Sequence, residues 1–172
     1  MSGVIIGGIG NVLCGDDAAG PTLIHQLSSL YEFPESVRLV DFGTPGLDFV
    51  VQISGLDALI LIDASDNGLE AGSIAEYDKN FILASPVPMR LDPHQPALKE
   101  SLWICDIDGQ APREVVLIGI TGQSYEMHSP LSPAVRAALQ PAAAVVLRHL
   151  ERLQLAARPI PGAHCESPWW ET

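Results

Sequence analysis

Acidic residues stand at the ends of the three most apolar runs in the N-terminal part of this 172-residue chain. Asp16 and Asp17 follow the first run, Asp41 ends the second, and Asp63 ends the third. The carboxyl ends of parallel strands meet at one edge of a sheet, so we expect these side chains to converge. Carboxylates within about 4–6 Å of each other repel, and one pKa rises unless a cation intervenes. The cluster therefore indicates a metal ion, a shared proton or a cationic substrate.

A histidine in a proline-flanked loop could complete such a site. His94 lies between Pro93 and Pro96, just before a predicted helix. One imidazole beside two carboxylates suits a borderline divalent ion and leaves coordination positions open. Spacing alone favours a solvated or locally hydrogen-bonded His94. His128, which follows the last predicted strand, is a rival for the same role.

The glycine loop at residues 8–13 invites comparison with a dinucleotide-binding fingerprint, with Asp41 in the place of the ribose-binding acid. Two features disfavour that interpretation. Leu13 occupies the third glycine position. Asp16 and Asp17 also place negative charge where the next helix would receive a pyrophosphate.

Nucleophilic catalysis has less support in the sequence. Cys14 lies in the glycine loop without an evident activating base, which favours a small half-buried thiol. Ser124 and Ser129 follow the last predicted strand, but neither stands in a Gly-x-Ser-x-Gly context.

Strands that alternate with helices must position these residues. We predict an α/β fold, a three-layer α/β/α sandwich with a mostly parallel, about five-stranded twisted sheet. Residues 79–95 are predicted to be irregular, Pro21 to take the first helical position, and Pro141 to kink or split the last helix. The predicted strands cover residues 4–9, 37–41, 58–63, 72–78 (possibly at an edge) and 114–120, and the predicted helices cover 20–30, a short stretch ending at 53, 96–105 and 132–157.

The periodic pattern stops near Ala157, which predicts a single domain over residues 1–157 and a C-terminal tail over 158–172. The tail contains three prolines and the adjacent Trp169 and Trp170. We expect it to be ordered only if these tryptophans find a groove.

Composition and charge narrow the partners and the compartment. The net charge of −12 repels nucleic-acid phosphates and anionic lipid, so we expect neither nucleic acid nor membrane as a partner. No apolar run reaches the ~18 residues that a membrane-spanning helix needs. Three scattered cysteines without a CxxC pair indicate reduced thiols and a cytoplasmic protein.

Five motifs in register resemble the nickel-iron hydrogenase maturation proteases. The segment from Gly8 to Gly20 resembles the family's opening signature, Gly-x-Gly-Asn-x-Leu followed by an acidic pair and glycine. The resemblance covers about residues 3–155. Its other parts are Asp41–Gly46, Leu61–Ala64, Pro93–Gln95, and Ile118–Ile120 with Leu131–Pro133.

The resemblance implies an endopeptidase that removes a C-terminal extension from the nickel-loaded large-subunit precursor of a hydrogenase. It places the metal-binding and catalytic residues on Asp17, Asp63 and His94. Nickel would be delivered in the substrate, and zinc or cadmium would substitute in vitro. Two alternatives stay open: a non-catalytic nickel-sensing assembly factor for hydrogenase, and the dinucleotide-binding domain.

Overall fold

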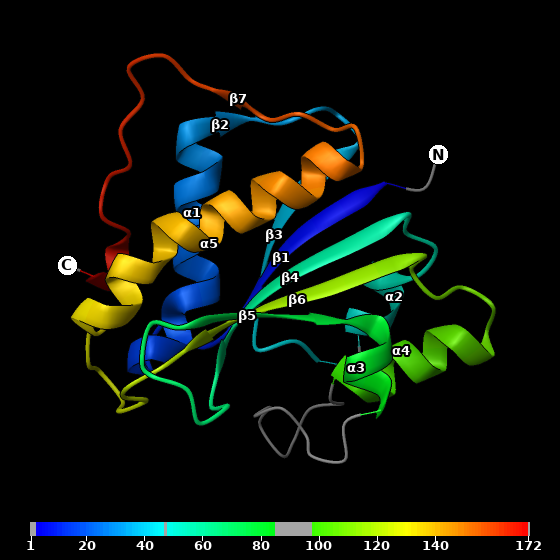
Figure 1. Ribbon diagram of the computed structural model, residues 1–172, viewed down its shortest axis with the longest axis horizontal. Helices are drawn as coiled ribbons and strands as arrows, with labels where there is room; N and C mark the ends of the chain where they lie inside the picture. The colour runs from blue at the N-terminus through cyan, green and yellow to red at the C-terminus, as the bar shows by residue number, and fades with distance from the viewer. Residues whose placement is uncertain (1–2, 47, 85–97, 172) are drawn as a thin grey trace.

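The computed structural model describes residues 3–46, 48–84 and 98–171. Its centre is a five-stranded sheet in the order β3-β1-β4-β6-β5 (Figure 1). The first four strands are parallel, and β5 runs antiparallel to β6 at the edge. The predicted α/β architecture is therefore confirmed. The strands of this sheet are β1 (Val4–Ile9), β3 (Val37–Gly43), β4 (Ala58–Ser65), β5 (Ile74–Asp78) and β6 (Glu114–Thr121).

Helices cover both faces of the sheet, as its buried and mostly apolar central strands require. Every residue of β1 and β4 is buried. On one face, Ile60 and Ile62 pack in a core with α1 and α5; on the other, Leu59 and Leu61 pack in a core with α2, α3 and α4. The helices are α1 (Ala19–Leu30), α2 (Phe49–Ile53), α3 (Lys79–Ala84), α4 (Leu98–Ile107) and α5 (Pro133–Arg152), with a 3₁₀ turn, η1 (Gly15–Ala18), before α1.

The start of the first helix differs from the prediction. The 3₁₀ turn η1 runs directly into α1 at Ala19, so Pro21 occupies the third helical position rather than the first. Proline is tolerated there because the first four N–H groups of a helix have no intrahelical partner. The early start brings the acidic pair Asp16–Asp17 into helical geometry.

Residues 79–84 form α3, whereas the sequence predicted an irregular segment. This helix is only six residues long, and one of its residues, Ile82, is buried in the core. So short a helix depends on tertiary packing rather than on its own propensity, and periodicity alone cannot reveal it.

The last helix is neither split at Pro141 nor as long as predicted. Buried Ala138, Ala142 and Val146 lie on both sides of the proline, and their packing holds α5 together through it. The helix ends at Arg152, five residues before the predicted end, and Gln154 has a positive φ of 61° that a continuing helix does not permit.

The tail beyond Ala157 lies against the α1–α5 side of the domain (Figure 1). Its first residues form β7 (Arg158–Pro159), which pairs antiparallel with β2 (Tyr31–Glu32) just after α1. Its last residues form a 3₁₀ turn, η2 (Trp169–Glu171). The division into a domain and a separate tail stays a prediction about folding, but the tryptophans do have contacts.

Candidate active site

The glycine loop after β1 allows the chain to approach Asp17 closely. Gly10 has a φ of 137°, and a Cβ atom there would lie 1.8 Å from the Asp17 carbonyl oxygen. Only glycine fits this position. The backbone N–H of Asn11 then donates to the Asp17 carboxylate at 2.8 Å, so the loop itself orients this side chain.

A second close approach brings α1 onto the sheet. A Cβ atom on Gly8 would lie 2.6 Å from the backbone of Gly20, and one on Gly20 would lie 2.6 Å from the Ile62 carbonyl oxygen. These glycines let the start of α1 touch both β1 and β4. The acidic turn η1 is thereby held beside the carboxyl end of β4, where Asp63 stands.

Asp17 and Asp63 influence each other electrostatically. Asp63 is only 7% exposed, and burial, together with the charge of Asp17, raises its pKa well above the usual 3.8, although the Ala64 backbone N–H opposes the shift. The pKa of the half-buried Cys14 thiol is also raised, by burial and by Asp17. The thiol therefore stays protonated at neutral pH, which disfavours a cysteine nucleophile.

The other strand-end acids have different surroundings. Asp41 is exposed and accepts the Gly43 backbone N–H at 2.8 Å, so it caps its own turn. It lines a cavity of about 300 Å³ formed by the turn after β3 and the start of α2. Asp16 is fully buried and accepts three backbone N–H groups, a role that the sequence did not indicate.

Of the two histidine candidates, the structure describes only His128. His94 lies outside the described residues. His128 is exposed, has a φ of 62°, and donates its backbone N–H to the Leu13 carbonyl at 2.7 Å. Within the described part of the chain, no three His, Cys, Asp or Glu side chains are grouped to hold a metal ion, so His128 does not complete a site with Asp17 and Asp63.

The hydroxyl groups of the serines in the β6–α5 loop form hydrogen bonds within that loop. Ser129 donates its hydroxyl to the Glu126 carbonyl at 2.7 Å, and the Ser124 hydroxyl accepts the Glu126 N–H at 3.4 Å. A further serine, which no sequence motif singled out, lies in β4. Ser65 is buried, and its hydroxyl oxygen has no hydrogen-bond partner among the described residues. It lies two residues after Asp63 and so on the same face of β4.

The arrangement suits a cation. Burial, and after it the charge of Asp17, raises the pKa of Asp63, and a divalent ion between the two side chains would relieve the repulsion between their charges. The same loop is poorly suited to a dinucleotide, because the Asn11 N–H that would receive a phosphate oxygen is already bonded to Asp17.

A cavity of about 640 Å³ lies at the opposite end of the sheet, where β4 and β6 begin and where β5 ends. Its charged lining is mixed, with Glu76, Asp78 and Glu114 beside Lys79, Arg113 and Arg152. In a parallel sheet the ligand site lies beyond the carboxyl ends of the strands, so the acidic residues there are the better candidate site. Among the described residues, no helix has the length and apolar character needed to cross a bilayer.

Comparison with known proteins identifies the family to which the chain is related. A family model described as hydrogenase maturation protease matches residues 21–149. The hydrogenase expression/formation protein HupM of Azotobacter chroococcum mcd 1 is 33% identical over 160 residues, covering 92% of this chain and 77% of the relative. The hydrogenase 2 maturation protease of Escherichia coli K12 is 28% identical over 161 residues, covering 94% and 98%.

A solved structure has the same fold. The hydrogenase maturating endopeptidase HybD from E. coli superposes with a TM-score of 0.83 at 27% identity, covering 91% of this chain and 97% of that one.

Proposed function

This chain belongs to the hydrogenase maturation protease family, and from that premise we propose that it removes a C-terminal extension from the large-subunit precursor of a nickel-iron hydrogenase. The precursor would carry its nickel, and Asp17, Asp63 and His94 would recognise that ion. The observation that carries the proposal is the pair of carboxyl groups Asp17 and Asp63, in which burial, and after it the charge of Asp17, raises the pKa of Asp63. We propose that the protein acts in the cytoplasm.

The pair supplies a reason for gating by the substrate's nickel. Without the ion, burial and the Asp17 charge favour the protonated form of Asp63. Arrival of a cation favours both carboxylates in their charged form, so docking of a loaded precursor releases a proton from Asp63. An unloaded precursor brings no cation, and Asp63 then keeps its proton.

The reaction itself is hydrolysis of one peptide bond. Water adds across the carbon–nitrogen bond, leaving a new carboxyl terminus on the mature subunit and a free amine on the released peptide. We infer that the buried Asp63, once ionised, would accept a proton of the attacking water. Asp17, whose carboxylate accepts the Asn11 N–H, would help to hold the substrate ion.

The decisive experiment incubates the protein with nickel-loaded and nickel-free precursor and weighs the products by mass spectrometry. We expect shortening of the loaded precursor only. Asp17→Asn and Asp63→Asn, which keep side-chain size and weaken coordination, should abolish cleavage while the fold remains. Equal cleavage of both precursors would overturn gating, and full activity of Asp63→Asn would remove the carboxyl pair from the mechanism.

Metal binding can be tested without a precursor. Nickel, zinc or cadmium at ~100 times its dissociation constant should stabilise the protein by about 2.7 kcal/mol, and His94→Ala should reduce the shift. A chain that binds nickel and the precursor but never shortens it would be the non-catalytic assembly factor instead.

A further inference from the structure

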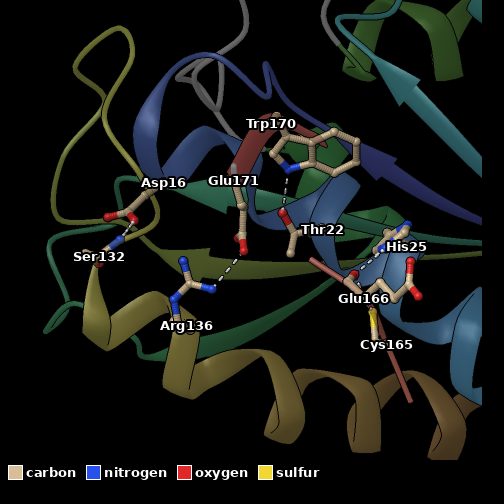
Figure 2. A network of polar contacts seen from close by, with 9 residues as sticks. All are labelled: Asp16, Thr22, His25, Ser132, Arg136, Cys165, Glu166, Trp170 and Glu171. Atoms are coloured by element: carbon tan, nitrogen blue, oxygen red, sulfur yellow. Dashed lines mark hydrogen bonds and ion pairs between the residues drawn. The ribbon is translucent and has the colours of Figure 1, made fainter. Parts of the chain in front are cut away.

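Asp16, the neighbour of the proposed ligand Asp17, directs its carboxylate to another part of the chain. The side chain is fully buried, and its three hydrogen-bond donors are backbone N–H groups of the segment between β6 and α5. Figure 2 shows the bond to Ser132 at the first turn of α5. The distances are 2.7 Å from Gln123 and 3.1 Å from Ser124 to Oδ2, and 2.6 Å from Ser132 to Oδ1.

Further contacts join the same two loops. The Asp16 N–H donates to the Ser124 carbonyl at 2.8 Å, and the His128 N–H donates to the Leu13 carbonyl at 2.7 Å. A Cβ atom on Gly15 would lie 2.6 Å from the Ser124 carbonyl oxygen, so the backbones are in close contact. The loop that holds Asp17 and residues 122–132 therefore form one packed unit.

The backbone donors around Asp16 suit a carboxylate side chain. A buried carboxylate that accepts several backbone N–H groups is held by charge-assisted hydrogen bonds, which are stronger than neutral ones. One donor belongs to Ser132, the N-cap of α5, where the helix dipole also favours negative charge. No ion pair among the described residues involves Asp16, so these backbone groups are what compensates its burial.

We propose that Asp16 is a positioning residue for the metal-recognition site. It fixes residues 122–132 against the first loop and thereby holds the Asp17 carboxylate in its orientation toward Asp63. It is not itself a ligand, because three of its acceptor positions are already used by backbone donors. This role rests on the proposed function of the Asp17–Asp63 pair.

The test measures binding of nickel alone by calorimetry, together with hydrogen–deuterium exchange and cleavage of a loaded precursor. Asp16→Asn turns one acceptor oxygen into an NH₂ group that faces backbone N–H donors. We expect nickel affinity and kcat to fall about 10–100-fold, as for supporting residues at metal sites. Exchange should increase in residues 122–132 and in the Asp17 loop. Asp17→Asn, in contrast, should lose nickel binding.

Two controls separate positioning from general stability. Val146→Ala removes a buried side chain from the distant half of α5, and we expect it to lower the melting temperature while nickel affinity and kcat stay unchanged. If Asp16→Asn does not fold, Gln123→Pro deletes one donor without touching Asp16, and Gln123→Ala keeps that N–H. We then expect the proline variant alone to lose nickel affinity and loop protection.

Several results would overturn the inference. These are wild-type nickel affinity and loop protection in the Asp16→Asn or Gln123→Pro variants, an equal loss in Val146→Ala, or complete loss of binding in Asp16→Asn as in Asp17→Asn. A wild-type protein that neither binds nickel nor cleaves the precursor would instead refute the proposed function. In that case unchanged exchange in Asp16→Asn would still overturn the positioning role, and increased exchange in both loops would support it.

Discussion

The two faces of the central sheet are covered in different ways. On one face lie α1 with 12 residues and α5 with 20, and the C-terminal tail lies against their outer side (Figure 1). On the other face lie α2, α3 and α4, with 5, 6 and 10 residues. Val51 of α2 and Ile107 of α4 are 77% and 85% exposed. One face is built of long helices and the other of short ones.

The alternation of side chains along β4 places Asp63 on the second face. Ile60 and Ile62 point to the core under α1 and α5, while Leu59 and Leu61 point to the other core. Asp63 continues the second series. Asp17 comes from the turn that leads into α1 on the long-helix face, and the face with short helices receives the buried carboxyl of Asp63.

The largest expected effect on stability tests the difference between the two faces of the sheet. Leu139 of α5 is 1% exposed, and Leu139→Ala should cost about 2–5 kcal/mol through lost burial and a cavity. Ile107→Ala on α4 should change stability by less than about 0.5 kcal/mol. Urea unfolding of both variants provides the measurement. Similar losses in the two would show that the second face is as tightly built as the first.

The next effect concerns pH and the buried carboxyl. Because the folded-state pKa of Asp63 lies above its ordinary 3.8, its contribution to stability is complete below that pH and is lost as pH rises through the raised value. In metal-free protein with a chelator, Asp63→Asn should therefore gain in melting temperature relative to wild type as pH increases. A difference that stays constant from pH 4 to 8 would contradict this.

A smaller effect is expected from the tail. Trp170 donates its indole N–H to the Thr22 hydroxyl at 3.4 Å and meets the His25 ring edge-on (Figure 2). A chain shortened to end at Ala157 should fold cooperatively but lose about 1–3 kcal/mol, since roughly one large side chain loses its burial. Calorimetry of both chains measures the loss. Non-cooperative melting of the shortened chain would make the tail part of the domain.

The smallest effect should come from the ion pair between Arg136 and Glu171. Arg136 donates to Glu171 at 3.0 Å, and the side chain of Arg136 is 48% exposed. Glu171→Gln keeps an acceptor for Arg136 and removes only the charge, so we expect a loss of about 0.2–1 kcal/mol that shrinks at high salt. A larger loss, unaffected by salt, would mean that this carboxylate anchors the tail by itself.

Much of the fold and part of the site followed from local sequence. Continuous apolar runs such as Ala58–Asp63 predicted buried parallel strands, because both faces of such strands are covered. The position of Asp63 at the end of one run predicted its place at the carboxyl ends of the parallel strands. The glycines at 8, 10 and 20 marked a sharp turn, although the sequence alone did not show which backbones they allow to touch.

Contacts between distant segments could not be read from the sequence. The partners of Asp16 are 107, 108 and 116 residues away, so nothing in its neighbourhood separated its role from that of Asp17. The helix at 79–84 and the contacts of Trp170 likewise depend on surfaces that exist only after the sheet and α1 have formed. The amino-acid order determined the strands of the central sheet and the acids that stand at their carboxyl ends. Tertiary packing decided how deeply each acid is buried and which backbone groups it contacts.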